Sequence, residues 1–349
     1  MIGLGRRRFR ASLLQGQPMP IRRTFLTMAA SAALLWPAGR QALGQAATVP
    51  RIAYLGPFDQ AALERFYLLL RPELEKLGWT DGRNIQLLAP DSSAGKTELL
   101  PAMAAEIVAQ APDLILVNAV PPTRAVMQAT KTIPIVMVSV GSPVELGIVA
   151  DYRKPGGNVT GSKYPAEEAA SKLLQFLKEA SPRLRSTALF VNPSNESTAA
   201  FVKHTRVDAS ALGLQLQVLE VRSAGDFEAA FAAIRRAGSE SILLPPEPLI
   251  QAHRELIAGF AQKHGLPLAV VAFGRFLPAS GLMAFGPAPT QYVSMTASYI
   301  DRILKDARPG DLPIEQPSRF ELTLNLKAAK ALGLTLPQSL LLRADEVIQ

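Results

Sequence analysis

Short apolar runs alternate with longer amphipathic segments along most of the chain. The run at 51–55 is rich in strand-forming residues, and the segment 63–77 that follows has apolar residues at helical spacing. The same alternation predicts further strands at 84–88, 114–117, 134–139, 186–191, 215–221, 241–244, 268–272 and 281–285. It predicts further helices at 97–110, 123–130, 166–180, 197–212, 226–237, 249–264 and 292–305. This order is typical of doubly wound parallel sheets, which helices cover on both faces.

A break at 155–158, with the sequence Pro-Gly-Gly-Asn, divides the pattern into two similar sets. About 300 residues exceed what one hydrophobic core usually organises. We therefore expect two α/β lobes rather than one long sheet. Lobe 1 is predicted to comprise 47–160 and 283–317, and lobe 2 to comprise 161–282 and 318–349.

The first part of the chain, 1–46, reads as an export signal peptide. Arg22 and Arg23 precede an apolar run at 25–36, and small residues follow. The apolar run is too short for a membrane span, which needs roughly 20 residues. The paired arginines resemble a twin-arginine signal, and an ordinary Sec signal that carries them is the alternative. Met19 is an alternative start that would give a signal of normal length.

The net charge of +8 comes almost entirely from this leader, which holds seven arginines and no acidic residue. The rest of the chain has 30 basic and 29 acidic residues, so no nucleic-acid partner is expected. There is no cysteine, which excludes Cys-based zinc sites, thiol catalysis and a lipid-anchoring cysteine. The three histidines form no His-Glu-x-x-His pattern, and a Gly-x-Ser-x-Gly elbow is missing. We expect no metal, cofactor or catalytic centre.

The candidate chemistry lies in the loops after the predicted strands, where open parallel sheets bind ligands. Turn formation and helix capping explain each loop singly, but several such loops facing one cleft favour a binding site. The expected ligand-binding residues are Phe58, Asn118, Thr123, Ser139, Gly141, Ser142, Asn192, Ser194, Glu247, Phe273 and Arg275.

These loops offer Ser, Thr and Asn side chains and helix N-termini, which favour a carboxylate ligand. We expect the carboxylate to be held mainly by neutral donors, with Phe58 or Phe273 stacking on the body of the ligand. Alternatively, Arg275 pairs with the carboxylate and Glu247 receives an amine.

Several segments resemble one family. They are Leu-Gly-Trp-Thr-Asp-Gly-Arg-Asn-Ile at 77–85, Ala-Thr-Lys-Thr-Ile-Pro-Ile-Val at 129–136, Pro-Gly-Gly-Asn-Val-Thr-Gly at 155–161, and three stretches at 312–317, 325–333 and 343–348. The chain thus resembles the TrpX-like group of exported ABC transporter substrate-binding proteins over essentially all of 50–349.

The resemblance implies a type I periplasmic-binding-protein fold, with two lobes joined by three crossings and the ligand in the cleft. It also implies an ABC permease and its ATPase as partners, and some members of the group bind aromatic amino acids. Two departures concern the ligand. The group's Gly-Asp-Pro-Val is Gly-Ser-Pro-Val at 141–144, which removes a carboxylate, and 151–153 reads Asp-Tyr-Arg instead of small and apolar residues.

The expected function is that of an unanchored, monomeric periplasmic receptor. It would close its cleft on a small amino-acid-like or carboxylate ligand and deliver that ligand to an ABC importer. A ligand-sensing module of a membrane sensor would look the same in sequence. An exported enzyme on this scaffold would require an acid–base pair, and no residue pattern indicates one.

Overall fold

The computed structural model describes residues 49–272 and 277–349, so the predicted signal peptide lies outside the described residues. A first parallel sheet has the strand order β2-β1-β4-β5-β6, and β3 also pairs with β1. Its strands are β1 (Arg51–Gly56), β2 (Gln86–Leu87), β3 (Asp91–Ser92), β4 (Leu114–Asn118), β5 (Ile135–Val140) and β6 (Val159–Lys163).

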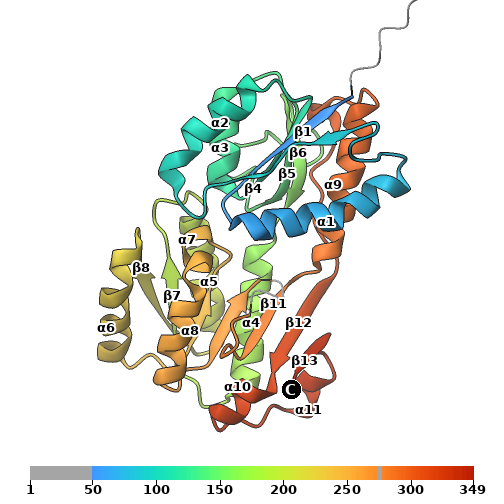
Figure 1. Ribbon diagram of the computed structural model, residues 1–349. Helices are drawn as coiled ribbons and strands as arrows, with labels where there is room; N and C mark the ends of the chain where they lie inside the picture. The colour runs from blue at the N-terminus through green and yellow to red at the C-terminus, as the bar shows by residue number, and fades with distance from the viewer. Residues whose placement is uncertain (1–48, 273–276) are drawn as a thin grey trace, which may run out of the picture. The chain divides into compact units, whose positions relative to one another are not determined.

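Helices cover both faces of this sheet, as Figure 1 shows. One face packs on α1 (Gln60–Lys76) and α9 (Pro289–Leu304), and the other on α2 (Leu100–Ala109) and α3 (Val120–Ala129). A short 3₁₀ turn, η1 (Thr97–Leu99), leads into α2.

A second sheet has the order β13-β12-β11-β10-β9-β7-β8 and is parallel except where β12 runs antiparallel to β11. Its strands are β7 (Ser186–Val191), β8 (Gln215–Glu220), β9 (Ile242–Leu244), β10 (Leu268–Val271), β11 (Met283–Pro287), β12 (Phe320–Asn325) and β13 (Glu346–Ile348). Its helices are α4 (Ala166–Ala180), α5 (Thr198–Ala211), α6 (Phe227–Ala237), α7 (Pro248–Ala252), α8 (Arg254–Lys263), α10 (Leu326–Ala331) and α11 (Gln338–Leu341). The two-lobed α/β prediction is confirmed.

The apolar runs become strands because both of their faces are buried. In β4, Leu114 and Leu116 pack in the cluster under α1 and α9, while Ile115 and Val117 pack in the cluster under α2 and α3. All four side chains are fully buried. A continuous apolar run is the pattern of a central parallel strand, whose alternate residues enter two different cores.

Two of the expected lobe boundaries differ from those that the strand order of the two sheets gives. The segment 155–158 precedes β6, which still belongs to the first sheet, so the chain leaves that sheet after Lys163. β11 belongs to the second sheet, although 283–287 was expected in lobe 1. The chain thus passes between the lobes three times, at 164–165, at Ala288 and along 312–319. From here on, a lobe means one sheet with the helices that pack on it.

Two helix predictions also change. α3 begins at Val120 rather than at 123, because Pro121 and Pro122 fit the first helical turn, where no backbone N–H donor is needed. The helix expected at 249–264 is two helices, α7 and α8, separated at His253, whose backbone is not helical.

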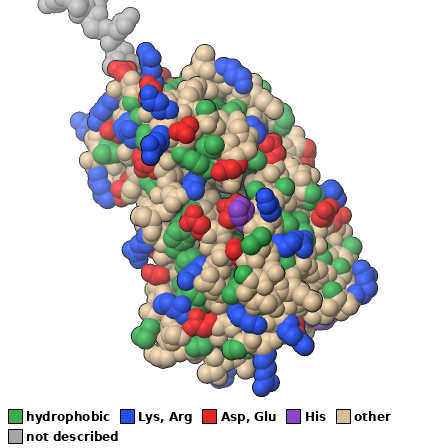
Figure 2. Space-filling view, turned by 180° about the vertical axis from the view of Figure 1, so that it is seen from behind, with side chains coloured by type: hydrophobic (Ala, Val, Ile, Leu, Met, Phe, Trp, Pro, Cys, Tyr) green, Lys and Arg blue, Asp and Glu red, His purple; other side chains and the backbone are tan. Residues whose placement is uncertain are grey.

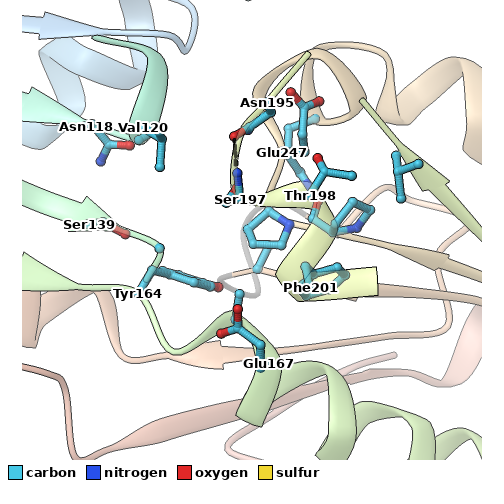
Figure 3. A pocket seen from close by; sticks show the side chains of 18 of the residues that line it. Asn118, Val120, Ser139, Tyr164, Glu167, Asn195, Ser197, Thr198, Phe201 and Glu247 are labelled. Carbon is cyan, nitrogen blue, oxygen red and sulfur yellow. Dashed lines mark hydrogen bonds between the residues drawn. The ribbon is translucent and has the colours of Figure 1, made fainter. Parts of the chain in front are cut away.

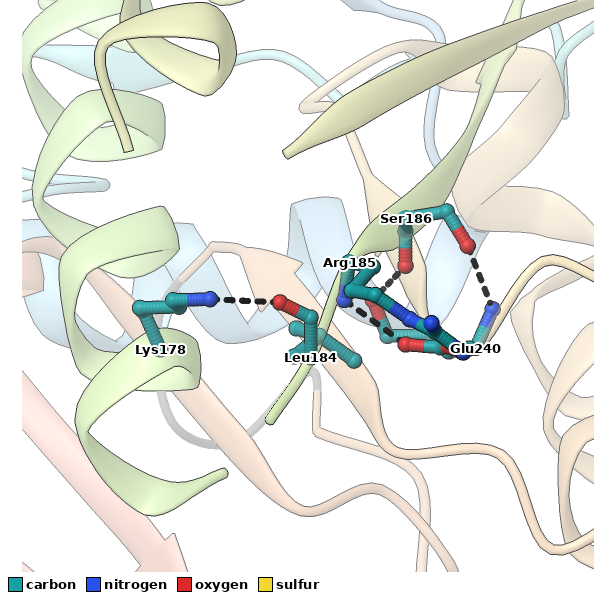
Figure 4. Close-up of polar contacts among 6 residues, drawn as sticks. Lys178, Leu184, Arg185, Ser186 and Glu240 are labelled. Carbon is teal, nitrogen blue, oxygen red and sulfur yellow. Dashed lines mark hydrogen bonds and ion pairs between the residues drawn. The ribbon is translucent and has the colours of Figure 1, made fainter. Parts of the chain in front are cut away.

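The amino ends of β7 and β9 are fastened by polar contacts (Figure 4). The backbone N–H of Arg185 donates to Glu240 Oε2 at 2.7 Å, and the Glu240 N–H donates to Ser186 Oγ at 3.1 Å. Lys178 Nζ donates to the Leu184 carbonyl at 2.6 Å. These contacts lie at the end of the sheet opposite the loops expected to bind the ligand.

The surface of the described residues carries mixed charge. Figure 2 shows Lys and Arg side chains interspersed with Asp and Glu on the face that it displays. In the described residues, no helix combines the length and the apolar character that crossing a membrane requires.

Candidate ligand-binding site

A cavity lies between the two lobes, where loops after the strands of both sheets meet (Figure 3). It encloses about 970 Å³, counting the space open to solvent at its mouth. Its lining is Phe58, Asn118, Ala119, Val120, Ser139, Gly141, Tyr164, Ala166, Glu167, Val191, Asn195, Ser197, Thr198, Phe201, Pro245, Pro246, Glu247, Gln251 and Ala272.

Lobe 1 contributes Phe58, Asn118, Ser139 and Gly141, four of the residues expected from the sequence. Asn118 ends β4, Ser139 lies near the end of β5, Gly141 directly follows β5, and Phe58 lies two residues after β1. The carboxyl ends of parallel strands therefore place these groups at one edge of the sheet. In Figure 3, Asn118 and Ser139 lie on the same side of the cavity.

Two other expected lobe 1 residues do not line the cavity. Thr123 is fully buried within α3, and its hydroxyl donates to the Ala119 carbonyl at 2.7 Å. It lies inside the helix because α3 starts three residues earlier than predicted. Ser142 is partly buried and is not among the lining residues, but its hydroxyl donates to the lining residue Glu167, at 3.3 Å from Oε1.

On the lobe 2 side, the start of α5 supplies a polar wall. Asn195 Oδ1 accepts from the Ser197 N–H at 3.2 Å and from the Ser197 hydroxyl at 2.9 Å. The Thr198 hydroxyl donates to the Asn192 carbonyl at 2.6 Å. Phe201, one turn further on, is buried and adds an aromatic surface to the cavity.

Glu247 is the most deeply buried charge-bearing group of the cavity, with 6% of its surface exposed. Its Oε2 accepts from the Ile250 N–H at 2.9 Å, which caps α7, and its Oε1 accepts from Asn192 Nδ2 at 3.2 Å. Burial raises the pKa of this carboxyl group, and hydrogen bonds from the Ile250 N–H, Asn192, Asn195 and the Leu249 N–H oppose that shift.

The remaining predicted site residues have different positions. Asn192 is buried behind Glu247 and does not line the cavity, and Ser194 is exposed, with its N–H on Asn192 Oδ1 at 3.0 Å. Phe273 and Arg275 lie outside the described residues.

Sequence reasoning missed seven polar or aromatic lining residues: Tyr164, Glu167, Asn195, Ser197, Thr198, Phe201 and Gln251. Five of them lie at or within the first turns of helices, where a helical pattern was expected and no ligand contact was sought. Tyr164 directly follows β6, a strand that the apolar pattern did not predict. Its ring stacks on Tyr292, with ring centroids 6.2 Å apart.

The lining suits a ligand with an apolar body and polar ends. Among the described lining residues there are two carboxylates, Glu167 and Glu247, and no Lys, Arg or His. In the described part of the chain, no group of three or more His, Asp or Glu side chains is placed to hold a metal ion.

A family model described as ABC transporter substrate binding protein matches residues 53–348. A tyrosine-binding protein of Clostridioides difficile (strain R20291) is 25% identical over 266 residues, which cover 75% of this chain and 74% of that protein.

Solved structures give the same fold. An ABC domain from Streptococcus pneumoniae in complex with L-Trp has a TM-score of 0.78 at 24% identity, and the match covers 86% of this chain and 99% of that one. A conserved domain protein from Vibrio cholerae has a TM-score of 0.78 at 25% identity, with the same coverage of 86% and 99%.

Proposed function

The chain belongs to the family of ABC transporter substrate-binding proteins, and we propose that it is the receptor for a small amino-acid-like ligand, which it delivers to an ABC importer. The observation that carries this proposal is the cavity between the lobes, with aromatic and apolar walls and polar groups on both sides. Two relatives support the ligand class, since one is a tyrosine-binding protein and another holds L-Trp.

The polar groups of lobe 1 suit the carboxylate of such a ligand. Asn118 and Ser139 present neutral hydrogen-bond donors to the cavity, and Phe58 and Phe201 offer aromatic surfaces for the body of the ligand. Hydrogen bonds from neutral donors to a charged group contribute about 1.5–3 kcal/mol each. The carboxylate is therefore bound without an obligatory cation.

Delivery follows from the three crossings between the lobes. Closure around a ligand uses a few residues in the connecting segments, and the closed form presents a surface that differs from the open one. The permease of the importer recognises that closed form. No step of this mechanism needs a catalytic group or a cofactor.

Export to the periplasm completes the proposal. Members of this family typically act outside the cytoplasm, and 1–46 has the features of a cleavable signal. The mature chain then acts as an unanchored monomer beside its permease.

A thermal-shift screen tests the ligand class. Residues 48–349 form one compact unit by themselves, so they can be produced without the leader. A ligand at 100 times its dissociation constant adds about 2.7 kcal/mol of stability. We expect stabilisation by L-tyrosine, L-tryptophan or a similar amino acid. A screen in which sugars or nucleosides stabilise the protein and amino acids do not would reject the proposal.

A further inference from the structure

We propose that Glu247 and Gln251 form a subsite for a primary ammonium group of the ligand, with Gln251 as a specificity-determining residue. The inference rests on the proposed function, which supplies an amino-acid-like ligand but not the groups that recognise its amine. It follows from the charge balance and the hydrogen-bond balance at one end of the cavity.

The charge of Glu247 has no partner among the described residues. Its donors are all neutral: the side chains of Asn192 and Asn195 and the backbone N–H groups of Leu249 and Ile250. The ion pairs of the described chain do not include Glu247. A buried carboxylate is costly unless a cation or several donors compensate it. The neutral donors satisfy the hydrogen bonding of the carboxylate, but its negative charge still lacks a described cation, and a cationic ligand group can neutralise it.

Gln251 supplies an unused acceptor on α7, the helix that Glu247 caps. Only 3% of its surface is exposed, and its Oε1 is buried without a hydrogen-bond partner among the described groups. Its Nε2 donates to the Pro245 carbonyl at 2.8 Å, which fixes the orientation of the amide, because a flipped amide would place two acceptors together. Its backbone N–H donates to the Glu247 carbonyl at 2.9 Å, so the two residues form one local unit.

An ammonium group answers both requirements at once. It carries one positive charge and three N–H donors, so it can pair with the Glu247 carboxylate and also donate to Gln251 Oε1. A deaminated analogue would leave the Glu247 charge without a cation and Gln251 Oε1 without a donor, and buried groups left uncompensated in this way discriminate strongly between ligands.

The second carboxylate of the cavity, Glu167, is a weaker candidate for this role. It is only partly buried, accepts from the Ser142 hydroxyl, and lies in the first turn of α4, where the helix dipole stabilises a negative charge. Figure 3 shows Glu167 and Glu247 at opposite sides of the cavity. The ammonium therefore binds at the Glu247 side.

Calorimetric titration of residues 48–349 with matched ligands tests the subsite. The probes are L-tyrosine and L-tryptophan, their deaminated analogues 3-(4-hydroxyphenyl)propionate and indole-3-propionate, and the amines tyramine and tryptamine. We expect each amino acid to bind about 100-fold more tightly than its deaminated analogue.

The variant Gln251→Met keeps the length of the side chain and removes the acceptor. It is expected to reduce the preference for the amino acid over its deaminated analogue about tenfold. The control Gln262→Met changes an exposed residue of α8 and should leave this preference unchanged. Glu247→Gln, which removes the charge, should reduce the preference further.

The outcomes separate the subsite from the proposed function. Equal affinity for the amino acid and its deaminated analogue overturns the subsite and leaves the proposed function standing, as does a Gln251→Met variant that weakens both equally. Binding of the amines alone, with loss in Gln251→Met, supports the subsite and overturns the amino-acid ligand. Failure of the amino acids, the analogues and the amines to bind overturns both.

Discussion

At the level of single residues, the raised pKa of the Glu247 carboxyl group predicts a pH dependence of binding. An ammonium ligand pairs with the ionised carboxylate, and burial makes that carboxylate take up a proton above the ordinary glutamate pKa of about 4.3. The affinity for L-tyrosine should therefore fall as the pH is lowered from about 8 to about 5. Calorimetric titration across this range measures the effect.

Two variants in the same lobe control this prediction. Glu247→Gln should bind weakly at every pH and lose the pH dependence. Glu240→Gln changes a glutamate at the other end of β9, whose pKa is lowered by the hydrogen bond from the Arg185 N–H, so it should retain the pH dependence. An unchanged pH profile in Glu247→Gln would contradict the assignment.

The raised pKa of Glu247 has the opposite pH effect on the stability of the ligand-free protein. Folded Glu247 holds its proton more tightly than unfolded Glu247, so its contribution to stability is present below the unfolded pKa and is lost as the pH rises through the folded pKa. Ligand binding and ligand-free stability thus change in opposite directions with pH.

A second residue-scale prediction concerns the ligand carboxylate. If Asn118 and Ser139 hold it, Asn118→Ala should weaken binding of L-tyrosine about tenfold or more, because one hydrogen bond to a charged group is lost. Arg275→Ala should weaken it tenfold or less. Abolished binding in Arg275→Ala would instead make Arg275 the anchor and reject the neutral-donor arrangement.

How far the site could be predicted from the sequence depends on where each residue lies. Asn118 and Ser139 lie at the carboxyl ends of β4 and β5, Glu247 lies in the loop after β9, and the geometry of parallel sheets brings such positions together. Gln251 and Phe201 lie inside helices, where an apolar or polar residue at that spacing is ordinary packing. Their place at the cavity depends on how the two lobes meet, which no local pattern encodes.

At the level of elements, β6 explains why the first crossing between the lobes was predicted too early in the chain. Gly156 and Gly157 have positive φ angles of 72° and 63°, so the motif begins as a turn, as the pattern indicated. The residues that follow pair with β5 over Val159–Gly161. Only the first of the five β6 residues, Val159, is apolar, so the segment lacks the apolar pattern by which a strand is recognised.

The substitution Gly161→Ala, which adds only one carbon atom, is predicted to destabilise the protein strongly. Its φ is +128°, and a Cβ atom there would overlap the backbone of Met137, lying 2.5 Å from its nitrogen. Gly161→Ala should therefore lower the free energy of unfolding by about 3 kcal/mol or more, because β6 must move away from β5. Urea unfolding of residues 48–349 measures this change.

Gly156→Ala is the matched control in the same motif. Gly156 also has a positive φ, but a Cβ atom there would meet no heavy atom within 4 Å. Gly156→Ala should therefore lower the free energy of unfolding only by the backbone strain of a side chain at positive φ, about 1–2 kcal/mol. Equal effects of the two substitutions would show that backbone strain, not the contact with Met137, makes Gly161 necessary.

At the level of the whole molecule, two polar contacts join the lobes beside the cavity. Arg124 of α3 pairs with Glu196 at the start of α5, with Nη2 2.7 Å from Oε2. The Ser142 hydroxyl contacts Glu167 of α4. Because each contact links one lobe to the other, each favours the lobe arrangement of this structure, in which the two walls of the cavity face each other.

The Arg124–Glu196 ion pair is expected to make a small, salt-dependent contribution to the affinity for the ligand. With 28% and 51% of the two side chains exposed, the pair belongs to the partly exposed class, which is worth about 0.2–1 kcal/mol. Glu196→Gln should therefore weaken L-tyrosine binding about fivefold at most in low salt. The difference from the wild type should vanish near 1 M salt, where the screening length is about 3 Å.

Small-angle scattering of the same samples shows whether this effect arises from closure. Ligand should reduce the radius of gyration of the wild type, and Glu196→Gln should require more ligand to reach the same value, with Glu240→Gln behaving as wild type. Since Glu196 does not line the cavity, a variant that binds weakly yet closes at the wild-type ligand concentration would contradict the role of the pair. A loss of affinity that persists in high salt would place the effect in the packing of α5 against the cavity, not in the charge.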